Sequence, residues 1–190
     1  EMEAQAGDGL SMRAARAVVR LFLLTEQQEI GEPFEQAVAE FESLALVPNR
    51  VIRVHRIAYL HIATGRLEQC RRATDEADRS RRLAQARAAI ATLRSCARSS
   101  LLRAGAQIAA ADLLILEGQP EQAKALLDAV PVLQLEVPSV AYEAARVQAR
   151  ALAALGAASA SRRQAEQALA TAQHWGWPHR AGWVTAEFDL

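Results

Sequence analysis

The chain has 190 residues, enough to bury one full hydrophobic core. Hydrophobic residues make up 51% of it and aromatic residues only 5%, so alanine and leucine must build that core, as in helical bundles. The formal net charge is +0, which gives no overall attraction to nucleic acid or to membranes, and no run reaches the ~18 apolar residues of a membrane-spanning helix.

The first fifty residues predict two helices. Residues 1–9 are polar and contain glycine, which predicts a frayed lead-in. A helix is predicted from about Ser11 to Leu24, closed by Gly31. Pro33 suits the first turn of a second helix. The predicted apolar face of that helix consists of Phe34, Ala37, Val38, Phe41 and Leu44.

The next segment predicts a helix with two possible ends. Asn49 is a good N-cap for a helix that carries Val51, Val54, Ile57, Ala58 and Ile62. Gly65 closes this helix in the interpretation that we favour. Because one glycine costs only ~1 kcal/mol inside a helix, the helix can also continue to about Ala77.

A polar loop at 74–80 is predicted to precede an arginine-rich helix. An apolar stripe along that helix consists of Leu83, Ala86, Ile90, Leu93 and Ala97. Residues 50–103 hold 13 arginines against 4 acidic residues, whereas residues 1–49 hold 3 arginines against 9. We interpret most of these arginines as a solvated face. The alternatives are an acidic protein partner and, less favoured, nucleic acid. Candidate partner-binding residues are Arg81, Arg87, Arg94 and Arg98.

The second half repeats one helical-hairpin pattern. Helices are predicted at about 100–117 and 120–130, and again at 139–155 and 160–175. Each pattern runs through a glycine, Gly118 or Gly156, which can take positive φ. Ser139 and Ser161 are predicted caps, and 130–137 is a predicted extended connector. The small residues expected at buried helix crossings are Ala111, Ala123, Ala149 and Ala165.

The spacing of these residues resembles the tetratricopeptide (TPR) repeat. Ala111, Leu114, Gly118, Ala123 and Leu127 match the centre of that pattern, and the second copy has four extra residues after Gly156. The resemblance implies an all-α, TPR-like stack of antiparallel helical hairpins, a right-handed α-solenoid. Residues 1–190 are then a single helical-repeat domain.

No residue pattern predicts catalysis, and no cofactor is expected. The chain lacks GxxxxGK[ST], GxGxxG, HExxH and GxSxG motifs. His55 and His61 lie about 240° apart around a helix, which favours structural roles over a shared metal. Cys70 and Cys96 lack metal-type spacing and are expected to be reduced thiols. We therefore expect no enzyme activity in this segment.

All three tryptophans lie near the end of the chain. After Gly176, Pro178 begins a predicted last helix containing Trp183, Val184 and Phe188. We interpret Trp175, Trp177 and Trp183 as a structural cap over the end of the stack. The alternative is an aromatic ligand box with cation–π contacts.

The terminal stretch ALATAQHWGWPHRAGWVTAEF resembles the C-terminal ends of large bacterial Ser/Thr kinase signalling proteins. The resemblance implies a non-catalytic regulatory scaffold that binds a protein or an intramolecular domain. The alternative function is the ligand-sensing half of a helical-repeat transcription regulator. The chain opens on Glu1 and has no signal-peptide pattern, so we expect the cytoplasmic, C-terminal part of a longer protein.

Overall fold

Helices make up nearly all the regular structure of the chain. The computed structural model describes residues 2–132 and 136–190, with side chains from residue 9 onward. Within those ranges the protein is all-α and contains no strand, as the sequence predicted. The chain divides into two compact units, Glu1–Ala97 and Arg98–Leu190, and each is described by itself.

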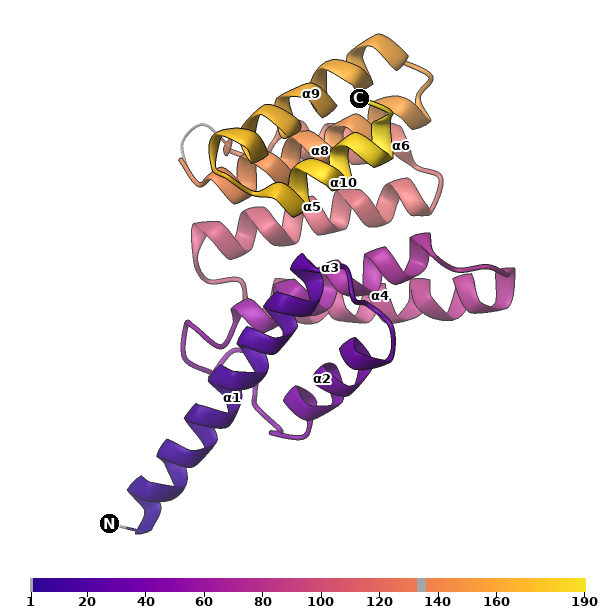
Figure 1. Cartoon of the computed structure of the whole chain (residues 1–190). Helices are drawn as coiled ribbons and strands as arrows, with labels where there is room; N and C mark the ends of the chain where they lie inside the picture. The colour runs from indigo at the N-terminus through magenta and orange to yellow at the C-terminus, as the bar shows by residue number, and fades with distance from the viewer. Residues whose placement is uncertain (1, 133–135) are drawn as a thin grey trace. The chain divides into compact units, whose positions relative to one another are not determined.

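Unit 1 contains four described helices (Figure 1). They are α1 (Met2–Glu26), α2 (Glu32–Glu42), α3 (Ile57–Arg71) and α4 (Glu76–Cys96). α1 contacts both α2 and α3, and α3 lies beside α4. The apolar face predicted for α2 is buried along its whole length, including Leu44 just after the helix. Pro33 lies in its first turn, as predicted.

Several boundaries predicted in unit 1 are wrong. The lead-in at 2–9 is part of α1, because extending a formed helix costs far less than starting one. α1 ends at Glu26 rather than at Gly31, and Gly31 is instead the N-cap of α2. Asn49 caps no helix, since 48–56 forms successive turns and α3 begins at Ile57. The β-branched residues of this segment disfavour a helix there.

Two further corrections concern α3 and α4. Gly65 does not close α3, which continues to Arg71 with Gly65 buried inside it. The predicted loop at 74–80 is shorter, because α4 begins at Glu76. Asp75 caps α4 by accepting a hydrogen bond from the backbone N–H of Asp78 at 2.8 Å.

Unit 2 contains the two predicted hairpins and the last helix. Its described helices are α5 (Ser100–Leu116), α6 (Pro120–Asp128), α8 (Pro138–Ala154), α9 (Ala158–His174) and α10 (Pro178–Phe188). α5 packs on α6 and α8 packs on α9, and α8 also contacts both α5 and α6. Ala111, Ala123, Ala149 and Ala165 are completely buried, as predicted. α10 (yellow in Figure 1) packs on α9.

The three helix ends marked by glycine share one turn geometry. Gly118, Gly156 and Gly176 have φ between 64° and 75°. In each case the residue after the glycine donates its backbone N–H to the carbonyl five residues earlier, at 2.8–2.9 Å. This is the Schellman ending, and glycine suits it because positive φ costs other residues conformational energy.

Two serine caps predicted in unit 2 are wrong. Pro138 already occupies the first turn of α8, so Val137 is the N-cap and Ser139 lies within the helix. Ser161 lies inside α9, buried, and its hydroxyl donates to the carbonyl of Ala149 at 2.8 Å. The predicted connector at 130–137 falls partly on residues 133–135, outside the described residues.

Candidate functional site

The outer face of α1 carries an unusual apolar seam. Met12, Ala15, Val19 and Phe22 follow one another at spacings of three, four and three residues, with Leu23 beside them. Met12, Val19, Phe22 and Leu23 are all exposed. The opposite face packs into unit 1 through Ala14, Ala17, Val18, Leu21 and Leu24. α1 is therefore apolar on both sides, although a surface helix usually has only one apolar stripe.

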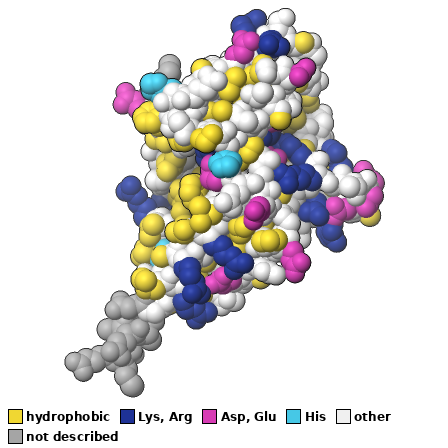
Figure 2. Space-filling view, in the orientation of Figure 1, with side chains coloured by type: hydrophobic (Ala, Val, Ile, Leu, Met, Phe, Trp, Pro, Cys, Tyr) yellow, Lys and Arg dark blue, Asp and Glu magenta, His cyan; other side chains and the backbone are white. Residues whose placement is uncertain are grey.

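Arginines flank this seam on one side. Arg13 and Arg16 are exposed, and Arg16 and Arg20 each bind Glu40 of α2 at 3.1 Å. These two arginines lower the pKa of the Glu40 carboxyl below its ordinary value. Figure 2 shows hydrophobic side chains beside arginines on the part of the surface next to the grey N-terminal residues. The seam thus has an apolar centre and one cationic edge.

A pocket of about 350 Å³ lies between residues 10–14 of α1 and the segment at 44–55. Its walls are mainly apolar and include Leu10, Ala14, Leu44, Val47, Val51 and Ile52. Three polar side chains also line it, from Ser11, Arg50 and His55. The pocket is open to solvent on one side and belongs entirely to unit 1.

The four arginines predicted to bind a partner fall in both units of the chain. Arg81, Arg87 and Arg94 lie on α4 in unit 1, and Arg98 lies in unit 2. Arg87 and Arg94 are exposed and seven residues apart, so they share one face of α4. Arg81 instead pairs with Asp78, which also accepts a hydrogen bond from Arg82 at 2.6 Å.

The tryptophans occupy three different environments in unit 2. Trp177 packs against the apolar cluster of α8, α9 and α10, and its ring meets Tyr142 edge-on at 6.3 Å. Trp175 is 53% exposed and stacks on Trp177 at 6.3 Å. The ring of Trp183 lies under the guanidinium of Arg146 at 5.6 Å. In the same region the Arg180 guanidinium lies 4.8 Å from the Trp177 ring centre.

Sequence reasoning missed a network of buried charges in unit 2. Arg146 and Arg150 are both more than 90% buried on α8. Arg150 binds Asp112 of α5 at 3.0 Å and both carboxylate oxygens of Glu187 of α10, and Arg146 donates to Glu187 at 2.7 Å. The signal in the sequence was Tyr142, Arg146 and Arg150 at four-residue spacing, which places all three on one face of α8.

The electrostatics of this network favour a structural role. Burial raises the pKa of Glu187, but the charges and hydrogen bonds of Arg150 and Arg146 outweigh that effect, so the pKa lies below its ordinary value. The Glu187 carboxylate therefore stays ionised at neutral pH, as a buried arginine requires of its partner. The two arginines are matched by two acidic side chains within the protein.

The histidines and cysteines are not brought together. His55 lines the unit 1 pocket, whereas His61 meets the Phe22 ring edge-on at 5.4 Å and lies 3.3 Å from the Thr25 hydroxyl. Cys70 and Cys96 are free and buried, and burial raises the pKa of the Cys70 thiol. In the described part of the chain, no group of three or more potential ligands from His, Cys, Asp and Glu is placed to hold a metal ion.

These observations define an all-α protein with an exposed apolar helix face and an apolar pocket among the described residues of unit 1. Across the described helices, none is both long and apolar enough to cross a membrane. Comparison with protein-family models, with curated proteins and with solved structures finds no match.

Proposed function

We propose that the chain is a non-catalytic protein-recognition module built on TPR-like stacked helical hairpins. The packing of α5 on α6, of α8 on α9 and of α8 on the first pair supports this interpretation, as do the repeated glycine turns. Its membership of a larger signalling protein with a Ser/Thr kinase is part of the same proposal. That part rests on the terminal sequence resemblance.

The observation that carries the proposal is the exposed seam of α1. Residues at alternating three- and four-residue spacing form the contact line of one helix with another. Met12, Val19 and Phe22 present such a line to solvent. Burying each of these side chains would contribute about 1–2 kcal/mol, so their continued exposure is costly unless a partner covers them. An amphipathic helix of another protein segment fits this surface.

The charges next to the seam indicate the character of that helix. Arg13 and Arg16 lie along one edge, and of the two Arg16 is paired with Glu40. A partner helix with acidic residues beside its apolar stripe would match both features. Arg87 and Arg94 on α4 would add long-range attraction, which acts mainly on the association rate.

The test uses two synthetic 21-residue amphipathic peptides with leucine at the seam positions. One carries glutamate and the other lysine at the flanking positions. Fluorescence anisotropy should show that the glutamate peptide binds the chain at least tenfold more tightly. Met12→Glu with Val19→Glu should abolish that binding, because the two charges would face an apolar stripe. The control, Gln85→Glu on the exposed part of α4, should bind as the parent does.

Two outcomes would remove the proposal. Equal binding of the glutamate peptide to the parent and to the double variant would place recognition elsewhere. The other outcome is that the parent chain sediments as a dimer and the double variant as a monomer, which would assign the seam to self-association.

A further inference from the structure

The pocket of unit 1 is separate from the α1 seam and has the composition of a small-molecule site. Ligand pockets of roughly 300–1,000 Å³ are mostly apolar and contain a few polar groups that fix the orientation of the ligand. The volume of about 350 Å³ lies at the small end of that range. It has room for about a dozen water-sized groups.

His55 is the most informative residue of the pocket. It is only 5% exposed, yet its side chain makes no hydrogen bond with any other described residue. Within the described residues its ring nitrogens are not among the fully enclosed side-chain atoms that lack a hydrogen-bond partner, so they keep access to solvent at the pocket. Because the residue lines the pocket, a polar group bound there can take the place of solvent as the hydrogen-bond partner of the ring.

Arg50 gives the pocket its charge. It is the charged residue among those that line the cavity, and it forms no ion pair within the described part of the chain. Its neighbour Arg56, by contrast, donates to the carbonyl of Asn49 at 3.3 Å. A guanidinium at an apolar pocket suits a carboxylate, which can accept two parallel hydrogen bonds from it.

We propose that this pocket binds a small monocarboxylate with an apolar body of roughly eight to ten carbon atoms. The carboxylate accepts hydrogen bonds from Arg50 and His55. The apolar body lies against Leu44, Val51 and the aliphatic residues of the rim. The proposal does not depend on peptide recognition by α1, because none of the seam residues Met12, Val19, Phe22 and Leu23 lines the pocket.

The probes are octanoate, octan-1-ol, octylamine and acetate, titrated into the full chain by isothermal calorimetry. Octanoate should bind with a dissociation constant of about 1 mM or lower. The other three should bind at least about tenfold more weakly, because each lacks either the anionic group or the apolar body. Equal binding of octan-1-ol would overturn the carboxylate assignment, and no binding of octanoate would overturn the site.

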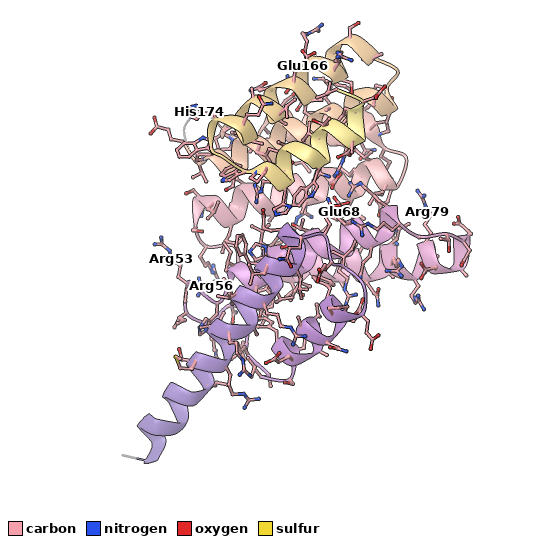
Figure 3. All side chains as sticks on the ribbon, viewed as in Figure 1. Arg53, Arg56, Glu68, Arg79, Glu166 and His174 are labelled. Carbon is pink, nitrogen blue, oxygen red and sulfur yellow. The ribbon has the colours of Figure 1, made fainter. Side chains whose placement is uncertain are left out.

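Variants locate the site. Arg50→Gln should weaken octanoate binding about tenfold and His55→Gln severalfold, while Arg53→Gln should leave it unchanged. Arg53 is the matched control because it is an exposed arginine of the same segment that does not line the pocket, and Figure 3 shows it pointing outward. Arg50 is exposed, so its variant keeps the test valid even if the His55 variant unfolds. Unchanged binding by Arg50→Gln would overturn the proposal.

A final experiment distinguishes binding of a small-molecule carboxylate from binding of the C-terminal carboxylate of a peptide. An eight-residue peptide ending in leucine is compared with its C-terminal amide. Binding of the free-acid peptide without binding of octanoate would show that the pocket reads chain ends, which would overturn the small-molecule assignment.

Discussion

The ring of Phe34 occupies the space that a side chain at Gly65 would need. A Cβ atom built on Gly65 would lie 2.2 Å from Cζ of Phe34, well inside van der Waals contact. α2 can therefore approach α3 closely only because residue 65 has no side chain. The contact brings Arg66 near the same ring, with its guanidinium 5.7 Å from the ring centre.

Gly65→Ala should destabilise the protein by about 1–3 kcal/mol, since overpacking outweighs the gain of about 1 kcal/mol in helix propensity. The control is Gly182→Ala in α10, where a Cβ would meet no atom within 4 Å. That variant should stabilise the protein by about 0.5–1 kcal/mol. Urea unfolding followed by circular dichroism measures both. A Gly65→Ala protein as stable as the parent would show that α2 can shift away from α3 without loss of stability.

Ala149→Leu should destabilise unit 2 by about 1–3 kcal/mol or more. Ala149 is completely buried, and its carbonyl accepts the hydrogen bond of the Ser161 hydroxyl from α9. A larger side chain would force these two helices apart. Ala153→Leu, at an exposed position on the same helix, should change the free energy of unfolding by less than about 0.5 kcal/mol. Equal effects of the two variants in thermal unfolding would refute the close packing of α8 on α9.

Glu187→Gln should reduce the loss of stability in acid. The folded-state pKa of Glu187 lies below its ordinary value of 4.5, so below about pH 5 the unfolded chain binds the proton more readily. The stabilisation from this carboxylate is therefore complete above that pH and is lost as the pH falls through the folded-state pKa. At pH 7 the variant should be less stable by about 2 kcal/mol or more, because two buried arginines lose an anionic partner. Glu166→Gln, which removes an exposed pair with Arg162, is the control. Parallel stability–pH curves for parent and Glu187→Gln would contradict the assignment.

Removing residues 177–190 should expose apolar surface and promote aggregation. Trp177 and Val184 pack on the alanine-rich faces of α8 and α9, and Glu187 pairs with both buried arginines. Light scattering at a fixed protein concentration measures the effect. Trp175→Ala, at a half-exposed tryptophan, should cause little aggregation. A truncated chain that stays monomeric and equally stable would favour a ligand role for the tryptophans.

Reversing Arg87, Arg94 and Arg98 to glutamate should slow capture of the glutamate-flanked peptide and reduce its salt dependence. The expected change is about tenfold in association rate at low salt, with little change in melting temperature. Stopped-flow fluorescence at two ionic strengths gives the rate. The same rate for parent and triple variant would confine recognition to the seam itself.

The sequence predicted unit 2 better than unit 1 for a physical reason. In unit 2, helices end at Gly118, Gly156 and Gly176, which have positive φ. Because glycine is the residue that adopts positive φ easily, these helix ends could be recognised in the sequence. α1 ends with the same hydrogen-bond pattern, but Gln28 takes positive φ there (54°). Nothing in local sequence favours a glutamine at that position. Gly65 led to the opposite error, a predicted helix end that does not exist. This glycine lies inside α3, where the absence of a side chain allows close packing with Phe34.

The candidate sites were harder to predict than the fold. Arginine counts marked the charge of residues 50–103 but could not distinguish Arg81, which pairs within α4, from Arg50, which lines a pocket. The pocket depends on the turns at 48–56, where a helix was expected. The buried network of Arg146 and Arg150 depends on partners 37–41 residues away, a distance at which periodicity carries no information.

The separation of these partners along the chain also sets an order of events during synthesis. In unit 1, Glu35, Arg66 and Gln69 hydrogen-bond one another and are all made within the first 71 residues. Unit 1 can therefore complete its polar interior while unit 2 is still being translated. Arg146 and Arg150 leave the ribosome well before Glu187. The guanidinium groups of these two residues of α8 are therefore incompletely neutralised until α10 has also left the ribosome. A pause in translation between α9 and α10 would lengthen the time for which unit 2 is open to misassembly, and unit 1 would be unaffected.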